Sequence, residues 1–221
     1  MELLIHQLLS KEESKKITSN ITKDNSCWID GKTSAGSYAA KVKNNLQLKK
    51  DSEVGVTNSN KVNNKLTSDQ LIKSFALPRK VHGTMFTRSS VGQGYGMHVD
   101  NAYMSSGRSD LSFTIFLSSP NEYQGGELLI QSMQGVKEIK LNCGQIVIYP
   151  STSLHSVKQV SQGERIVCVG WIQSYVANNE DRNFLFGLDA GARGLLAKHG
   201  RSDELDLVFQ AYSNLLRRLG D

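Results

Sequence analysis

The first candidate for chemistry is a histidine and an aspartate separated by one residue, His98 and Asp100. Along a β-strand, residues i and i+2 point to the same face, so an imidazole and a carboxylate at this spacing project together. His155, which follows the turn-like segment 150–153, is the best third ligand. Two histidines and one carboxylate leave one side of a metal ion open, which is typical of non-haem iron(II) oxygenases.

The other histidines are weaker candidates. The chain has five histidines in all. His82 lies on an earlier predicted strand, where a structural histidine is more common than a ligand. His6 and His199 lie near the two ends of the sequence, where a surface position is the default expectation.

Arg165 is the candidate anchor for a carboxylate group, because arginine forms a two-pronged pair with a carboxylate that lysine does not match. The segment 161–163 between it and His155 predicts a three-residue hairpin loop with Gly163 in the left-handed conformation. In that register Arg165 shares a face with His155, roughly 13 Å along the strands. A surface salt bridge near the turn is the alternative, and the nearby triad disfavours it.

The elements that must position these residues are short strands. Between Val81 and Ser174, β-branched and aromatic runs alternate with Gly, Ser and Asn. Such strands at close spacing, with no helix-length segment between them, predict an all-β barrel or sandwich and disfavour a parallel α/β sheet. The predicted strands are residues 81–88, 95–100, 111–118, 127–131, 136–141, 145–149, 154–160 and 165–173.

Helical patterns precede the strands. The segment Ser10-Lys11-Glu12-Glu13 is a capping box that predicts a helix to about Thr22. Residues 28–60 are rich in Gly, Ser, Asn and Lys and predict loops and short strands. A second helix is expected from about Asn60 to Ala76, ending before Pro78.

The helical pattern returns after Ser174. Ser202 is expected to cap a helix near the C-terminus, with Gly220 at its end. Apolar residues at helical spacing predict one face that packs on the barrel. These residues are Leu205, Val208, Phe209, Tyr212, Leu215, Leu216 and Leu219.

Composition sets the outer limits. The 221 residues, of which 38% are hydrophobic and 21% charged, suffice for one globular domain with a core and a small appendage. No run approaches the length of a membrane-spanning helix, and no signal peptide is expected. Cys27, Cys143 and Cys168 are too widely spaced for a disulfide scaffold or a CxxC metal site, so a cytoplasmic, reducing location is expected.

The net charge of +5 is concentrated early in the chain. Residues 1–75 contain twelve lysines and no arginine. Such a region suits an acidic partner, although a solvated lysine-rich surface is the simpler interpretation. Aromatic residues are sparse there, which disfavours binding to single-stranded nucleic acid.

The chain resembles the PKHD-type hydroxylases, bacterial Fe(II)/2-oxoglutarate dioxygenases related to prolyl 4-hydroxylases. The resemblance covers nearly the whole chain. The segments that carry it are residues 95–102, 108–112, 123–128, 149–155 and 171–174, together with 28–31, 42–45 and the C-terminal part from about residue 179.

This resemblance implies a fold that is mainly β with flanking α: a double-stranded β-helix, or jelly roll, with N-terminal helices and a C-terminal helical extension. The expected organisation is an N-terminal helical and loop region over residues 1–78, the dioxygenase core over 79–176 and the extension over 177–221.

The resemblance also implies an activity, the hydroxylation of an unactivated C–H bond with conversion of 2-oxoglutarate to succinate. Its cofactors and co-substrates would be Fe(II), 2-oxoglutarate, O₂ and L-ascorbate. His98, Asp100 and His155 would bind iron and form the catalytic centre, Arg165 would bind the 2-oxoglutarate C5 carboxylate, and Tyr95 would contribute to co-substrate binding. The resemblance specifies neither the oligomeric state nor the substrate, for which peptidyl proline, a free amino acid and a siderophore-like molecule all fit.

One residue departs from the pattern. Related hydroxylases often carry a tyrosine nine residues before the first iron histidine, and Ser89 stands there in this chain. Weaker or reorganised binding of 2-oxoglutarate is therefore expected. Ser89 is also the feature that favours a non-catalytic, metal-binding or regulatory jelly roll, whereas the presence of all four key residues argues against it.

A nucleic-acid demethylase is the other alternative. The resemblance to such AlkB-like enzymes requires an acidic residue and a second arginine where this chain has Ala102 and Trp171, so this alternative is disfavoured. Trp171 is instead expected in the barrel interior, and Asp110 is expected to form a structural pair with Arg108. Residues 43–45 suit either a turn or the mouth of a substrate site.

Overall fold

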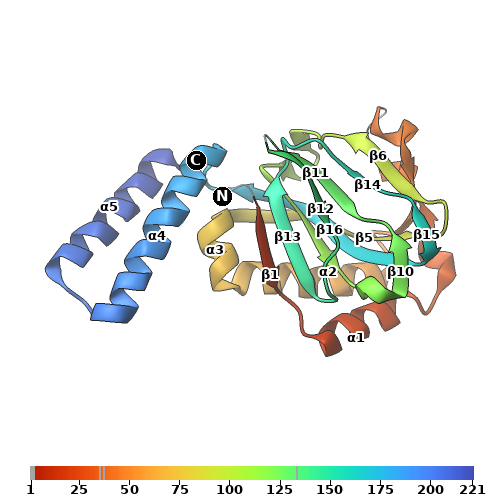
Figure 1. Cartoon of the computed structure of the whole chain (residues 1–221), viewed down its shortest axis with the longest axis horizontal. Coiled ribbons are helices and arrows are strands. Elements are labelled where there is room, and N and C mark those ends of the chain that lie inside the picture. Colours follow the sequence, from red (N-terminus) through yellow and green to blue (C-terminus); the bar gives the residue numbers. More distant parts are fainter. Residues whose placement is uncertain (1–2, 35, 37, 133) are drawn as a thin grey trace.

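The computed structural model describes residues 3–34, 36, 38–132 and 134–221, and two antiparallel β-sheets form its centre (Figure 1). The larger sheet has seven strands, in the order β1 (Leu4–Gln7), β13 (Gln145–Pro150), β9 (Leu111–Phe116), β16 (Arg165–Ser174), β5 (Pro78–Ser89), β4 (Leu46–Leu48) and β2 (Trp28–Asp30). The smaller sheet has five, in the order β12 (Gly135–Ile139), β11 (Leu128–Ser132), β14 (His155–Val157), β6 (Gly94–His98) and β3 (Lys43–Asn44).

Neighbouring strands in these sheets are mostly distant in sequence, which is the arrangement of a jelly roll and confirms the predicted fold class. Each of the eight predicted strands is present, with ends displaced by a few residues. Two further pairs lie at the rim: β7 (Tyr103–Met104) with β8 (Gly107–Arg108), and β10 (Tyr123–Gly125) with β15 (Val160–Gly163).

The hairpin predicted over residues 161–163 is wrong. β15 pairs with β10 and not with β16, and β14 and β16 belong to different sheets. Gly163 does adopt a positive φ of 74°, as predicted. An added Cβ there would lie 2.1 Å from the Glu122 carbonyl oxygen, so the crossing to β10 requires glycine.

Strand alternation separates two cores. On β9, Leu111, Phe113 and Ile115 point away from the smaller sheet, toward a cluster that includes residues of the N-terminal helices. The next residue, Phe116, packs instead between the sheets with Leu128, Ile130, Ile139, Val147, Tyr149 and Val167. The N-terminal helices cover the outer face of the larger sheet, and the smaller sheet covers part of its inner face. The rest of the inner face carries polar residues that line a cavity.

Three N-terminal helices cover the outer face of the larger sheet: α1 (Lys11–Ile21), α2 (Glu53–Ser68) and α3 (Gln70–Ala76). The capping box of α1 is confirmed, because Ser10 Oγ accepts from the Glu13 amide while the Glu13 carboxylate accepts from the Ser10 amide. The single helix predicted from Asn60 to Ala76 is wrong in its start and its continuity. Ser52 caps α2 earlier, and Asp69 ends α2 and caps α3.

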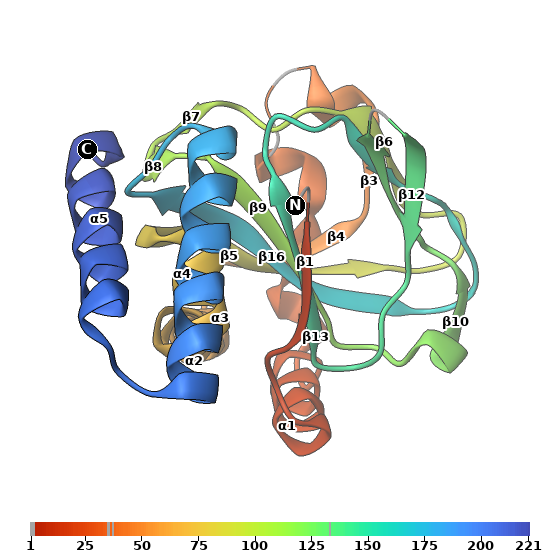
Figure 2. The same cartoon turned by 60° about the vertical axis from the view of Figure 1, so that its left-hand side comes forward.

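The C-terminal helices α4 (Asn179–His199) and α5 (Asp203–Leu219) form a pair at one end of the molecule (Figures 1 and 2). Ser202 caps α5, as predicted. The apolar stripe of α5 packs against α4 and against Leu77 and Val176, where β5 begins and β16 has ended. The expectation that the stripe packs on the barrel is therefore met only at this edge. None of the described helices is long and apolar enough to cross a membrane.

Candidate metal and co-substrate site

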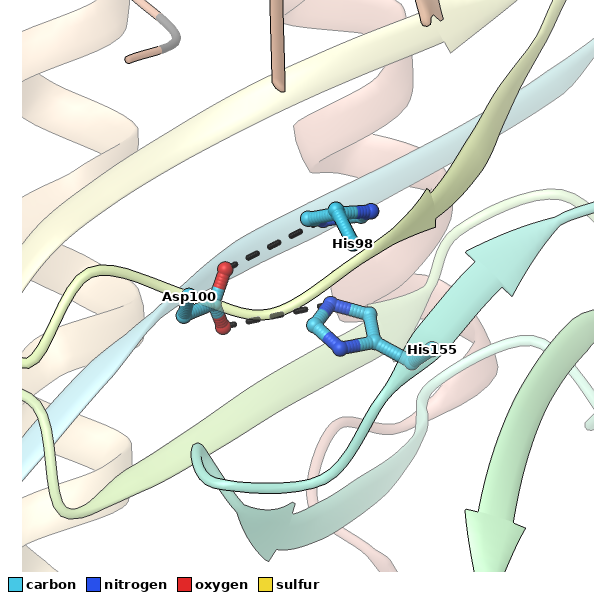
Figure 3. Close-up of side chains that lie close together, drawn as sticks. All are labelled: His98, Asp100 and His155. Atoms are coloured by element: carbon cyan, nitrogen blue, oxygen red, sulfur yellow. Dashed lines mark ion pairs between the residues drawn. The ribbon is translucent and has the colours of Figure 1, made fainter. Parts of the chain in front are cut away.

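His98 and His155 lie directly opposite each other on neighbouring antiparallel strands. His98 is the last residue of β6, and His155 is the first residue of β14. Asp100 stands in the loop just after β6, and its two oxygens lie 3.9 Å from His98 Nε2 and 3.9 Å from His155 Nε2 (Figure 3). One candidate ligand atom from each residue falls within a span of 4.8 Å, so a single metal ion fits between the three side chains.

Backbone carbonyl groups orient both imidazole rings. His98 Nδ1 donates to the Gly96 carbonyl at 2.8 Å, and His155 Nδ1 donates to the Ser153 carbonyl at 3.0 Å. Both Nε2 atoms are therefore left as acceptors that face Asp100, the tautomer that binds a metal ion. Burial and the neighbouring His155 lower the pKa of His98, which keeps its ring in the neutral form that a metal requires.

Two donors hold the Asp100 carboxylate. Ser112 Oγ lies 2.6 Å from Asp100 Oδ2, and Trp171 Nε1 donates to the same oxygen at 2.9 Å. Ser112 Oγ is in turn 2.8 Å from Ser151 Oγ. Trp171 lies in the interior, as predicted, but it also orients a candidate ligand. Local spacing does not reveal that Ser112 and Trp171 hold Asp100. They reach Asp100 from β9 and β16, which are distant from it in the sequence.

Arg165 faces the same cavity from the larger sheet, where it pairs with Ser89 of β5. Its side chain is buried, and its guanidinium lies 5.3 Å from the ring centre of Phe116. Within the described ranges no carboxylate lies within ion-pair distance of it, and both Arg165 Nε and the Tyr123 hydroxyl are buried without a hydrogen-bond partner. A buried cation without a counter-ion is typical of a site that binds an anionic ligand.

Tyr95 packs beside the triad. Its ring stacks on the His98 ring with 3.6 Å between the ring centres. Burial raises the pKa of Tyr95 to about 12, so the phenol remains neutral. Ser89 also lines the cavity, next to Arg165, and its small side chain leaves room that a tyrosine would fill.

The cavity between the sheets has a volume of about 440 Å³, within the range of small-molecule sites. All five residues predicted for the site, His98, Asp100, His155, Arg165 and Tyr95, line it. Lys43 and Asn45 line it too, which supports the mouth interpretation of residues 43–45 over a simple turn.

The competing histidines lie elsewhere. His82 is held by the Arg108 carbonyl at 3.0 Å and by Ser106 Oγ at 3.0 Å, and His6 contacts Asp69 at 2.9 Å. Among the residues that the structure describes, no second group of three or more metal-ligating side chains occurs. Selecting His155 as the third ligand is consistent with this geometry.

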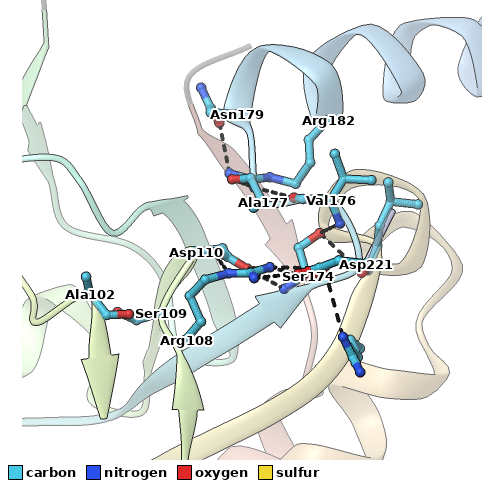
Figure 4. Close-up of polar contacts among 12 residues, drawn as sticks. Ala102, Arg108, Ser109, Asp110, Ser174, Val176, Ala177, Asn179, Arg182 and Asp221 are labelled. Carbon is cyan, nitrogen blue, oxygen red and sulfur yellow. Dashed lines mark hydrogen bonds and ion pairs between the residues drawn. The ribbon is translucent and has the colours of Figure 1, made fainter. Parts of the chain in front are cut away.

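Arg108 and Asp110 form the structural pair that was expected. Arg108 Nε lies 2.7 Å from Asp110 Oδ1, and the same guanidinium also contacts Asp221 and the Ser174 carbonyl (Figure 4). Asp110 Oδ2 accepts from the Ser174 amide at 2.8 Å. This network joins β8, β16 and Asp221 at the end of the barrel.

Comparison with known proteins assigns the class. The family model described as the 2OG-Fe(II) oxygenase superfamily matches residues 84–173. A PKHD-type hydroxylase of Prochlorococcus marinus strain SARG is 63% identical over 220 residues, and one of strain MIT 9303 is 64% identical over 220 residues; both alignments cover 100% of each chain. The chain therefore belongs to the PKHD-type hydroxylases, within the 2OG-Fe(II) oxygenase superfamily.

Solved structures agree on the fold. A Pseudomonas putida prolyl-4-hydroxylase matches with a TM-score of 0.58 and 14% identity, over 78% of this chain and 92% of that one. A Trichoplax adhaerens prolyl hydroxylase, solved with a peptide of a hypoxia inducible factor, matches with a TM-score of 0.60 and 12% identity, over 83% and 86%. The family membership confirms the predicted hydroxylase class, with iron and 2-oxoglutarate, over a non-catalytic jelly roll.

Proposed function

We propose that the chain hydroxylates an unactivated C–H bond, with His98, Asp100 and His155 as the iron ligands and Arg165 as the anchor of the 2-oxoglutarate C5 carboxylate. One observation carries the proposal: the three candidate ligands converge within 4.8 Å in the same cavity as a buried arginine that lacks a carboxylate partner in the described structure. The donor set of two imidazoles and one carboxylate suits ferrous iron and leaves positions open for co-substrates.

Each residue has a part in the proposed reaction. His98 and His155 offer neutral Nε2 atoms, and Ser112 and Trp171 fix the carboxylate of Asp100. Iron, when bound, supplies the redox chemistry that couples decarboxylation of 2-oxoglutarate to insertion of oxygen into the C–H bond. The protein orients the reactants and excludes water from a cavity enclosed by two sheets.

Co-substrate binding rests on the larger sheet. The guanidinium of Arg165 forms a two-pronged pair with the distal carboxylate of 2-oxoglutarate. The burial of Arg165 Nε without a hydrogen-bond partner supports this role. Tyr95 holds the His98 ring at the opposite wall.

Three finer assignments accompany the proposal. L-ascorbate is the reductant that keeps the iron ferrous, an assignment that rests on the family resemblance. The substrate is a protein or a small molecule, and a nucleic acid is disfavoured because Trp171 is committed to Asp100. We place the protein in the reducing cytoplasm, which the three unpaired cysteines of the described structure support.

The test is the visible charge-transfer band of the anaerobic complex with Fe(II) and 2-oxoglutarate. The wild type is expected to form the band, His155→Ala to lose it, and Arg165→Met to require a far higher 2-oxoglutarate concentration. His6→Ala, far from the cavity, is the matched control and should behave as the wild type. Bound iron without a band, or an undiminished band in His155→Ala, would contradict the assignment.

A further inference from the structure

Three polar side chains from the segment before the barrel line the cavity and have no part in the proposed reaction. They are Lys43, Asn45 and Lys50. Lys43 is 6% exposed and Asn45 is 8% exposed, so both are buried to more than nine-tenths. Asn45 Oδ1 lies against the backbone of Gly31, so the two lysines are the groups of this set that can reach a ligand. Buried polar groups that face a cavity in this way are typical of a binding site.

Lys43 lies one aromatic ring away from the triad. In the register of β3 and β6 it pairs directly with Tyr95. Its ammonium group lies 5.4 Å from the centre of the Tyr95 ring, and that ring stacks on His98. A ligand group held by Lys43 would therefore sit beside the metal-binding residues.

The two lysines act on each other. Burial and the nearby charge of Lys50 lower the pKa of Lys43 to about 8, while Asp100 and Asp30 oppose this effect more weakly. Burial also lowers the pKa of Lys50. Two like charges that share one partly desolvated cavity repel each other, and an anion between them would relieve that repulsion.

When the charges of iron and 2-oxoglutarate are added to those of the lining residues, the cavity carries a net positive charge. Among the described lining residues, Asp100 is the only acid. Asp100 and the two carboxylates of 2-oxoglutarate balance the ferrous ion and Arg165. Lys43 and Lys50 add two positive charges to this set, and Asp30, which lies outside the lining, opposes them only weakly at Lys43, so a further anion is favoured.

We propose that Lys43 and Lys50 form a subsite for an anionic group of the hydroxylated substrate, a carboxylate or a phosphate. This inference rests on the proposed function and adds a substrate class to it. The anion tethers the substrate at the wall formed by β3 and β6, so that a neighbouring C–H bond faces the triad. A neutral molecule of the same shape lacks this tether.

The test uses matched probes on the intact protein loaded with Zn(II) and saturating 2-oxoglutarate. N-acetylglycine and inorganic phosphate are the anionic probes, and N-acetylglycinamide is the neutral twin of the first. Binding is measured from the attenuation of the probe signals in relaxation-edited NMR. Lys43→Met and the more exposed Lys50→Met are compared with Lys49→Met, which removes a neighbouring surface lysine outside the cavity lining.

At least one anionic probe is expected to bind the wild type and Lys49→Met, with affinity reduced about tenfold or more in Lys43→Met and in Lys50→Met. The amide is expected not to bind. Equal binding of the acid and the amide, or unchanged anion binding in both cavity variants, would overturn the subsite. Preference between the two anions distinguishes a carboxylate from a phosphate.

The anaerobic Fe(II) and 2-oxoglutarate band separates this inference from the proposed function. It should be unchanged in Lys43→Met and Lys50→Met. If both variants lose the band, the lysines belong to the co-substrate site and the subsite is wrong. If the wild type shows no band, the proposed function is wrong. The binding of the NMR probes to the same protein then still tests the anion subsite.

Discussion

The indole nitrogen of Trp171 donates a 2.9 Å hydrogen bond to Asp100 Oδ2, so a residue of β16 fixes a candidate metal ligand in the loop after β6. Trp171 belongs to the larger sheet, and Asp100 follows a strand of the smaller sheet. The carboxylate is therefore held by a contact across the barrel, and its orientation depends on the separation of the sheets. The width of the cavity and the orientation of the Asp100 carboxylate thus depend on each other through the Trp171 side chain.

Replacing Trp171 with phenylalanine removes the donor and keeps an aromatic ring. Partners of metal ligands typically contribute tenfold to a hundredfold in metal affinity, so we expect Fe(II) to bind about tenfold or more weakly. Anaerobic titration with Fe(II) measures this. Trp28→Phe is the control, because Trp28 Nε1 donates to the Ile21 carbonyl and lies outside the cavity lining. Equal losses of affinity in both variants would contradict a specific role for Trp171.

The stability of the metal-free protein should depend on pH through Lys43. Burial lowers the pKa of Lys43 from its ordinary value of 10.5 to about 8. Between these values the unfolded chain binds a proton that the folded chain has released, so stability rises with pH. Below pH 8 both states are protonated, and the cost of burying the charge is felt in full.

The measurement compares urea unfolding of the wild type and Lys43→Met from pH 7 to pH 10.5. The wild type is expected to gain roughly 1–3 kcal/mol relative to the variant over this range. Lys49→Met controls for general effects of a lost lysine and should follow the wild type. A constant difference between wild type and Lys43→Met at all pH values would show that the Lys43 ammonium is not desolvated.

Asp110→Asn should destabilise the fold and spare the metal site. The carboxylate accepts from Arg108 and from the Ser174 amide, and its side chain is 5% exposed. Removing its charge leaves Arg108 incompletely paired, which we expect to cost about 2–3 kcal/mol in urea unfolding. Asp221→Asn, at the exposed end of the same network, should destabilise the fold less than Asp110→Asn does. A large loss of Fe(II) affinity in Asp110→Asn would instead connect this network to the triad.

His82→Ala tests the choice of ligands. His82 is buried, and both of its ring nitrogens have protein partners. We expect the variant to lose roughly 1–3 kcal/mol of stability and to bind one Fe(II) with unchanged affinity. The opposite pattern, a stable protein with impaired iron binding, would place His82 in the metal site.

The sequence was informative wherever the signal was local. His98 and Asp100 stand out because of their residue types and two-residue spacing, and the Ser10 capping box and the Ser202 cap each depend on a few neighbouring residues. The hairpin that would bring Arg165 beside His155 is wrong, yet both residues line the same cavity. Arg165 faces His155 across two sheets and does not lie beside it along a hairpin.

Long-range pairing explains what was missed. The partner of β15 is β10, and no local pattern specifies which strands of a jelly roll pair with each other. Ser112 and Tyr123 acquire their places near Asp100 and Arg165 only from such pairing. The early start of α2 has a weak signal, because Val54 and Val56 are the only large apolar residues of its first two turns and the buried face there is formed by Gly55 and Asn58.

The direct opposition of His98 and His155 also has a meaning for folding. The two histidines meet only after β6 and β14 have paired, so under the proposed assignment a tight metal site cannot exist in the unfolded chain. A bound ion then acts as a removable cross-link between strands that are distant in sequence, and it stabilises the native state in proportion to its occupancy. Iron supply would thus set the lifetime of the protein as well as its turnover, with amide hydrogen exchange slowed most along these two strands.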